Sequence, residues 1–149
     1  EYWFLSNSTH VVDLAFFLGG VPREISCYLS GRLDWHPSAS AFAGAGISET
    51  GAIFNYQANW AAPGRWSVEV LTKFRRFVFR PLEKLQVQHI GSVVLQEMEI
   101  DDSIDIEFKP GLFLQTRNFL EAKLEGMCTL GEHCAKLPVY CRMAGYLDS

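Results

Sequence analysis

Residues 51–60 read GAIFNYQANW and carry the strongest periodic pattern in the chain. Two sets of side chains alternate along this stretch. The first set is Ala52, Phe54, Tyr56, Ala58 and Trp60, and the second is Ile53, Asn55, Gln57 and Asn59. An alternation with a period of two predicts a β-strand whose two sets face opposite sides of a sheet. The stretch therefore predicts one aromatic, core-facing side and one mainly polar side.

The segments that follow this strand predict an antiparallel meander. Pro63-Gly64 suits a type II turn, because proline fixes φ and glycine accepts a positive φ. Further strands are expected over residues 66–72, 76–79 and 82–89, with a tight connection at 73–75. Such short connections join antiparallel strands, since parallel strands need long crossovers.

The residues before the strand predict a short helix, a further strand and a loop. A helix is expected over 9–18, capped by Asn7, Ser8 or Thr9 and ended by Gly19-Gly20. Its expected core stripe consists of Val11, Leu14, Ala15 and Leu18. Residues 24–30 alternate as a strand does. Residues 31–50 are rich in Gly, Ser and Ala and predict a long irregular loop.

Two helices are expected after an acidic stretch, over 111–125 and 130–146, the second kinked or delayed by Pro138. The order of elements predicts an α+β fold, with an open, mainly antiparallel sheet and helices packed on one face. The 149 residues match a single domain, 1–149. Because the first residue is Glu1 rather than Met, we expect a piece of a longer protein.

Composition and sequence pattern argue against several classes of protein. A net charge of −4 argues against nucleic-acid binding, which normally needs a basic excess. No stretch approaches the roughly 20 apolar residues of a membrane span, and no signal peptide opens the chain. The cysteines have no metal-binding spacing, so buried free thiols in a cytoplasmic location are favoured over disulfides, and no metal is expected. These cysteines are Cys27, Cys128, Cys134 and Cys141.

His10 and Asp13 are the first candidates for chemistry. They lie three apart and therefore share a face of the predicted helix. A carboxylate there can orient an imidazole and favour its protonated form, which suits a general acid or base at the rim of a pocket. Phe17 continues the same face. The alternative is a structural helix start, with the aspartate interacting with the helix dipole.

A second group of candidates lies on and near the predicted strand. Asn55, Gln57 and Asn59 span about 13 Å of one face and offer donors and acceptors to a polyhydroxylated ligand. The alternative is a sheet face that meets only water. Arg65 and Trp66 can hold a sugar or a carboxylate, or form an ordinary cross-strand contact. GAGISETG, residues 44–51, lacks the third glycine and the frame of a dinucleotide-binding loop.

Four segments together resemble a known family. They are NSTHVVDLAFFLGG, GAIFNYQANWAAPGRWSVEVLT, RFVFRPLEKL and GLFLQTRNFLE, which begin at residues 7, 51, 76 and 111. In this order they resemble the C-terminal domain of the Gfo/Idh/MocA family of oxidoreductases, which includes glucose–fructose oxidoreductase and inositol dehydrogenase. The resemblance implies a separate N-terminal Rossmann domain that binds NAD or NADP and is absent from this chain. It also implies that the sheet mediates homo-oligomers.

The resemblance implies a proton-transfer role for His10, accompanied by Asp13, and makes Asn7 a candidate substrate contact. Many dehydrogenases of the family carry an aspartate four residues before the histidine, whereas this chain has Ser6. The expected function is the substrate-binding and oligomerising domain of an NAD(P)-dependent oxidoreductase that acts on a hydroxyl of a sugar or polyol. The alternative is a non-catalytic binding or scaffold domain.

Overall fold

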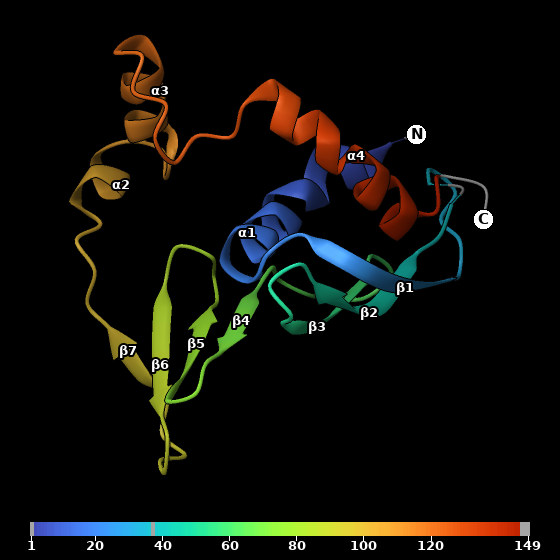
Figure 1. The fold of residues 1–149 in the computed structure, drawn as a ribbon, viewed down its shortest axis with the longest axis horizontal. Coiled ribbons are helices and arrows are strands. Elements are labelled where there is room, and N and C mark those ends of the chain that lie inside the picture. The colour runs from blue at the N-terminus through green and yellow to red at the C-terminus, as the bar shows by residue number, and fades with distance from the viewer. Residues whose placement is uncertain (1, 37, 147–149) are drawn as a thin grey trace.

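The chain has an α+β fold with two antiparallel sheets, seen in a computed structural model that describes residues 2–36 and 38–146 (Figure 1). The first sheet has the order β1-β2-β3, and the second has the order β4-β5-β6-β7. The strands are β1 (Pro22–Ser30), β2 (Ala41–Ser48), β3 (Ile53–Asn59), β4 (Val68–Leu71), β5 (Arg75–Phe79), β6 (Leu85–His89) and β7 (Gln96–Met98). The α+β class and the antiparallel pairing predicted from the sequence are confirmed.

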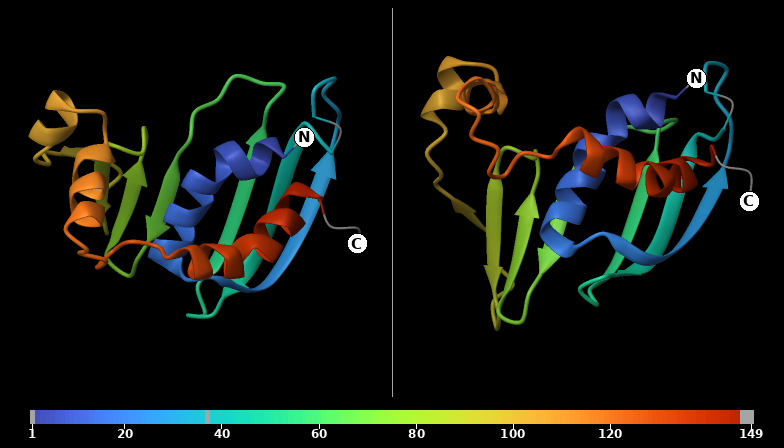
Figure 2. Two further views of the ribbon diagram at one scale, coloured as in Figure 1. Left: turned by 90° about the horizontal axis from the view of Figure 1, so that it is seen from above. Right: turned by 45° about the horizontal axis from the view of Figure 1, so that its top comes forward.

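The helices gather in two places. They are η1 (Phe4–Ser8, a π-helix), α1 (Thr9–Gly19), α2 (Ser103–Glu107), α3 (Leu112–Leu120) and α4 (Leu130–Ala144). Helices α1 and α4 lie side by side over one face of the first sheet (Figure 2). Helices α2 and α3 stand apart from that layer, at the end of the molecule that carries the second sheet (Figure 1).

The loop predicted over 31–50 is wrong, because Ala41–Ser48 forms the central strand of the first sheet. Its glycines are required because aromatic rings of β3 cross it and backbone carbonyl oxygens of β1 approach it closely. A Cβ built on Gly44 would lie 2.4 Å from the Tyr56 ring, and one on Gly46 would lie 2.7 Å from the Phe54 ring. Glycine here makes room for aromatic side chains and does not mark a loop.

The single open sheet predicted from the sequence is also wrong, because the sheet is interrupted after β3. Strand β4 pairs with β5 and not with β3. The type II turn predicted at Pro63-Gly64 is absent, since Gly64 does not have a positive φ. The chain turns earlier, where the Ala62 N–H donates to the Asn59 carbonyl. Pro63 has no N–H to donate to a ladder, which favours the break in pairing at this connection.

The helix predicted over 9–18 is confirmed, but the predicted core stripe is displaced. Phe16 is the buried apolar residue of α1, whereas Leu18 is 40% exposed. The Phe16 ring packs edge-on to Phe54 and parallel to Tyr140 of α4, at centroid distances of 6.2 and 6.3 Å. A phenyl ring buries more apolar area than the leucine does, so this face of the helix turns toward the sheet.

A hydrophobic core cluster lies between the first sheet and the helices η1, α1 and α4. Its buried members are Phe4, Phe16, Ala39, Phe42, Tyr140, Met143 and Ala144. All four cysteines are free thiols, as predicted, but the predicted burial is wrong, because Cys128 and Cys134 are exposed and Cys27 and Cys141 are only half-buried. Helix α4 begins at Leu130, as predicted, and contains Pro138, so of the two expected effects of this proline the delayed start does not occur. Within the residues described, no helix combines the length and the apolar character that crossing a membrane requires.

The start of α4 at Leu130 has a local cause. The Thr129 side chain accepts a hydrogen bond from the Glu132 N–H, and the Glu132 carboxylate accepts one from the Thr129 N–H. This capping box satisfies two N–H groups that would otherwise lack partners at the helix start. It also holds the pKa of Glu132 below its ordinary value.

Candidate functional site

His10 lies in the first turn of α1, directly after the π-helical turn η1. The junction is held by the Thr9 hydroxyl, which donates to the Leu5 carbonyl at 2.8 Å. The His10 side chain is exposed, and its ring lies 6.1 Å from the ring of Trp66. The histidine is therefore presented to solvent beside an aromatic ring and is not packed into the core.

Trp66 belongs to the connection between β3 and β4, which also places Arg65. The Arg65 side chain lines a cavity of about 330 Å³ together with residues of the turn before β6 and of α2. The other lining residues are Glu83, Lys84, Asp102, Asp105, Ile106 and Pro110. Within it, Lys84 Nζ donates to Asp102 Oδ2 at 3.0 Å, and this contact raises the pKa of Lys84. The cavity thus offers both positive and negative groups to a polar ligand.

Asp13 faces α4. Its Oδ1 accepts hydrogen bonds from Lys136 Nζ at 2.5 Å and from the Tyr140 hydroxyl at 2.9 Å. Burial raises the pKa of Asp13, but the bonds from Lys136 and Tyr140 outweigh that effect and hold the pKa below its ordinary value. The bond to Asp13 raises the pKa of Lys136. Among the described residues, no hydrogen bond joins Asp13 to His10, so the aspartate acts here as a link between two helices.

We expect Asp13→Asn to destabilise the fold by about 2 kcal/mol, the scale of a hydrogen bond to a charged group in a partly buried place. The folded-state pKa of Asp13 lies below its ordinary value of 3.8. Its contribution is therefore present above that value and is lost as the pH falls through the folded pKa. Urea unfolding at pH 7 and pH 3 measures this. The wild type should lose stability between them, and the Asn variant should lose less. An equal loss in both proteins would contradict the linkage.

The amides of β3 lie on the other face of the sheet. Asn55, Gln57 and Asn59 are exposed, whereas Phe54 and Tyr56 point toward the helices. Asn59 also has a local role, because its Oδ1 accepts a hydrogen bond from the Ala61 N–H at 3.0 Å. Since α1 covers the opposite face, the structure does not bring these amides together with His10 in one chain.

Of the remaining candidate residues, the structure places some near His10 and others apart from it. His10 and Trp66 are brought together, and Arg65 is the sequence neighbour of Trp66. Asn7 is half-buried in η1, three residues before the histidine. The candidate site therefore consists of the first turn of α1 and the connection before β4. The amides of β3 are not part of it, because they lie on the opposite face of the sheet.

Sequence reasoning missed the partners of Asp13. Lys136 and Tyr140 lie four residues apart on α4, so both reach the same neighbour. That spacing was the available signal, but it identifies a shared helix face and not the helix that it meets. Most of the charged groups around the cavity come from residues 83–84 and 102–105. These two segments are far apart in the sequence, and no local pattern predicts that they lie together.

Two features of cofactor sites are not found among the described residues. Their strand pairs are all antiparallel, so they contain no βαβ unit with a glycine-rich turn for a pyrophosphate. In residues 2–36 and 38–146, no group of three His, Cys, Asp or Glu side chains is arranged to hold a metal. The described residues thus offer an exposed imidazole beside the Trp66 ring and a cavity lined by Arg65 and other charged side chains.

Comparisons with known proteins give no further guide. No protein-family model matches the chain, and no curated protein or solved structure is significantly similar to it.

Proposed function

We propose that this chain is the substrate-binding and oligomerising domain of an NAD(P)-dependent oxidoreductase that acts on a hydroxyl of a sugar, a polyol or a related compound. The observation that supports this proposal most is the exposed His10 in the first turn of α1, beside Trp66. An imidazole in such a place can exchange protons with a bound ligand, because it is held by a helix and remains open to solvent. The family resemblance supplies the reaction class.

In the proposed reaction, the neutral imidazole of His10 accepts the hydroxyl proton as the carbinol becomes a carbonyl. NAD or NADP, bound mainly by a Rossmann domain outside this chain, would take up the hydride from the carbinol carbon. The indole of Trp66 can pack against the C–H face of a sugar. The guanidinium of Arg65 can donate hydrogen bonds to hydroxyl or carboxylate oxygens.

We assign the open face of the first sheet to assembly with a second copy. Strand register places Ala45 of β2 between Ser26 and Asn55, and Ala43 between Tyr28 and Gln57. The middle of the central strand thus presents alanine side chains, and Ile47 at its end lies beside Ile53 of β3 on the same face. The alanines allow another sheet to approach, while the amides at the edge can pair across the interface. In this proposal Asn55, Gln57 and Asn59 serve the interface between copies and do not reach the site of their own His10.

A non-catalytic scaffold domain is the second candidate. Ser6 favours it, because the resemblance leads us to expect a carboxylate there. The Ser6 hydroxyl instead donates to the Tyr2 carbonyl at 3.3 Å on the surface. A serine at this position supplies no charge to a neighbouring imidazole.

The oxidoreductase and scaffold candidates can be distinguished by whether the complete protein turns over a substrate. The complete protein, incubated with NAD or NADP and a panel of polyols and sugars, should form reduced nicotinamide with at least one of them. Absorbance of the reduced cofactor measures this directly, and heat-denatured protein is the control. A folded protein that binds the cofactor but turns over none of the panel would favour the scaffold candidate.

A further inference from the structure

The molecule exposes more surface than its mass requires. A compact monomer of 16.8 kDa exposes about 7,700 Å². This chain exposes 10840 Å². The difference, on the order of 3,000 Å², exceeds the roughly 800 Å² per partner that a stable complex buries. Part of this surface is therefore expected to be covered by another protein surface.

Helix α3 is the clearest uncovered element. None of its residues is buried, and it stands away from both sheets (Figure 1). Phe119 and Leu120 are 68% and 76% exposed. A helix of nine residues is marginal in water by its own propensity and normally depends on packing. An apolar helix face of this kind therefore requires a partner.

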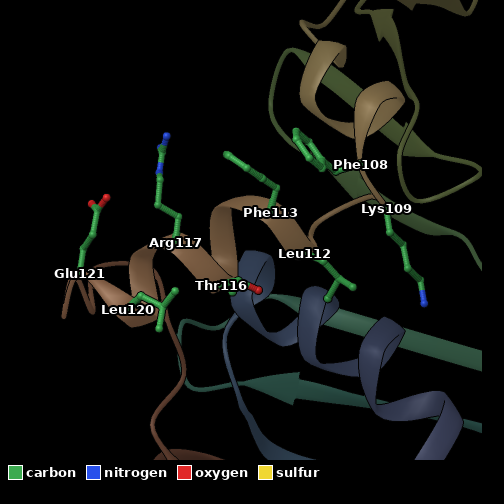
Figure 3. A pocket seen from close by; sticks show the side chains of 8 residues that line it. All are labelled: Phe108, Lys109, Leu112, Phe113, Thr116, Arg117, Leu120 and Glu121. Carbon is green, nitrogen blue, oxygen red and sulfur yellow. The ribbon is translucent and has the colours of Figure 1, made fainter.

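One face of α3 carries a groove whose aromatic side chains are held by contacts within the chain. Its groove has a volume of about 490 Å³ and is lined by Phe108, Lys109, Leu112, Phe113, Thr116, Arg117, Leu120 and Glu121 (Figure 3). The rings of Phe108 and Phe113 stack at 4.4 Å, and the Arg117 guanidinium lies 5.7 Å from the Phe113 ring. These contacts fix the aromatic wall of the groove before any partner arrives.

The charges along the groove suit a second copy of the same helix. Lys109 lies at one end and Glu121 at the other (Figure 3). Phe113, Arg117 and Glu121 point to one side of the groove, and Lys109 points to the other side (Figure 3). A two-fold axis through the middle of the groove would place Lys109 of each copy against Glu121 of the other. The groove is complementary to itself in antiparallel orientation.

We propose that the groove of α3 binds α3 of a second copy of this chain, antiparallel and through a two-fold axis. This interface is separate from the open face of the first sheet. Within its own chain Glu121 pairs with Lys123 at 2.7 Å, but both side chains are exposed and such a pair holds the carboxylate only weakly. In the proposed pair, the stacked phenyl rings and Leu120 supply the apolar centre, and the two Lys109–Glu121 contacts fix the register.

Charge exchange tests the proposal in the complete protein. Lys109→Glu and Glu121→Lys each convert both contacts of a homodimer into like-charge contacts. Each variant alone should raise the dissociation constant for self-association about tenfold, which corresponds to about 1.4 kcal/mol. An equimolar mixture of the two variants restores both opposite-charge contacts in the heterodimer. Sedimentation velocity at several concentrations should show wild-type association for the mixture only.

Two further variants serve as matched controls. Leu120→Asp, in the groove, should weaken association at least tenfold, whereas Leu114→Asp, on α3 but outside the groove lining, should not. Ile53→Lys, on the open face of β3, should leave the effect of the α3 variants unchanged. The proposal is overturned if the single charge variants associate like the wild type, or if they weaken association and the mixture does not recover it. The second outcome would mean that a different surface covers α3.

Discussion

In the complete protein, His10→Ala is expected to lower kcat by about 10²- to 10⁴-fold, the usual contribution of a positioned proton-transfer group. The loss of stability should be small, below about 1 kcal/mol. The physical reason is the place of the side chain: His10 is exposed, while Phe16 of the same helix carries the packing onto the sheet. Removal of the imidazole leaves that packing intact.

Phe17→Ala provides the matched control, because Phe17 is on the same helix and 73% exposed but has no proton to exchange. It should alter neither kcat nor the melting temperature appreciably. His10→Gln separates proton transfer from hydrogen bonding, since an amide can bind a hydroxyl but cannot accept its proton at neutral pH. If His10→Ala melts many degrees lower and retains turnover, the histidine is a structural residue and the proposed function loses its main support.

The elements that were predicted well from the sequence are those whose pattern of side chains depends only on local structure. The alternation from Ile53 to Asn59 arises because each side chain faces either the helices or the open side, and β3 lies there. The glycine pair at 19–20 ends α1 because Gly20 has a φ of 90° and its N–H donates to the Phe16 carbonyl. Such signals are local and need no knowledge of the neighbouring strand.

The predictions that were wrong depend on residues far away in the chain. Strand β2 has few large side chains of its own, so its place in the sheet is decided by Phe54 and Tyr56 of β3. Similarly, the carboxylate of Asp13 meets Lys136 and Tyr140, which are more than 120 residues away. A spacing of three on one helix suggested His10 as its partner. The hydrogen bonds are made instead to a helix that the sequence could not place beside it.

Gly44→Ala is expected to destabilise the protein by about 3 kcal/mol, near the upper end of the usual cost of overpacking. A Cβ at this position would lie 2.4 Å from the Ser26 carbonyl oxygen and 2.4 Å from the Tyr56 ring. The carbonyl belongs to the paired backbone of β1 and cannot move without breaking the ladder. The ring is held between the sheet and the helices. For a domain of this size, the melting temperature should fall by roughly 10 °C.

Gly64→Ala is the matched control for this prediction. A Cβ on Gly64 meets nothing within 4 Å, and its backbone does not have a positive φ. The substitution should therefore be neutral or stabilise the protein slightly, because alanine reduces the freedom of the unfolded chain. Circular dichroism on heating measures both variants. Equal melting temperatures would mean that β2 is not the packed central strand and that the glycine-rich stretch is the loop its composition suggests. If only Gly44→Ala lowers the melting temperature, β2 needs small residues because the rings of β3 cross this strand.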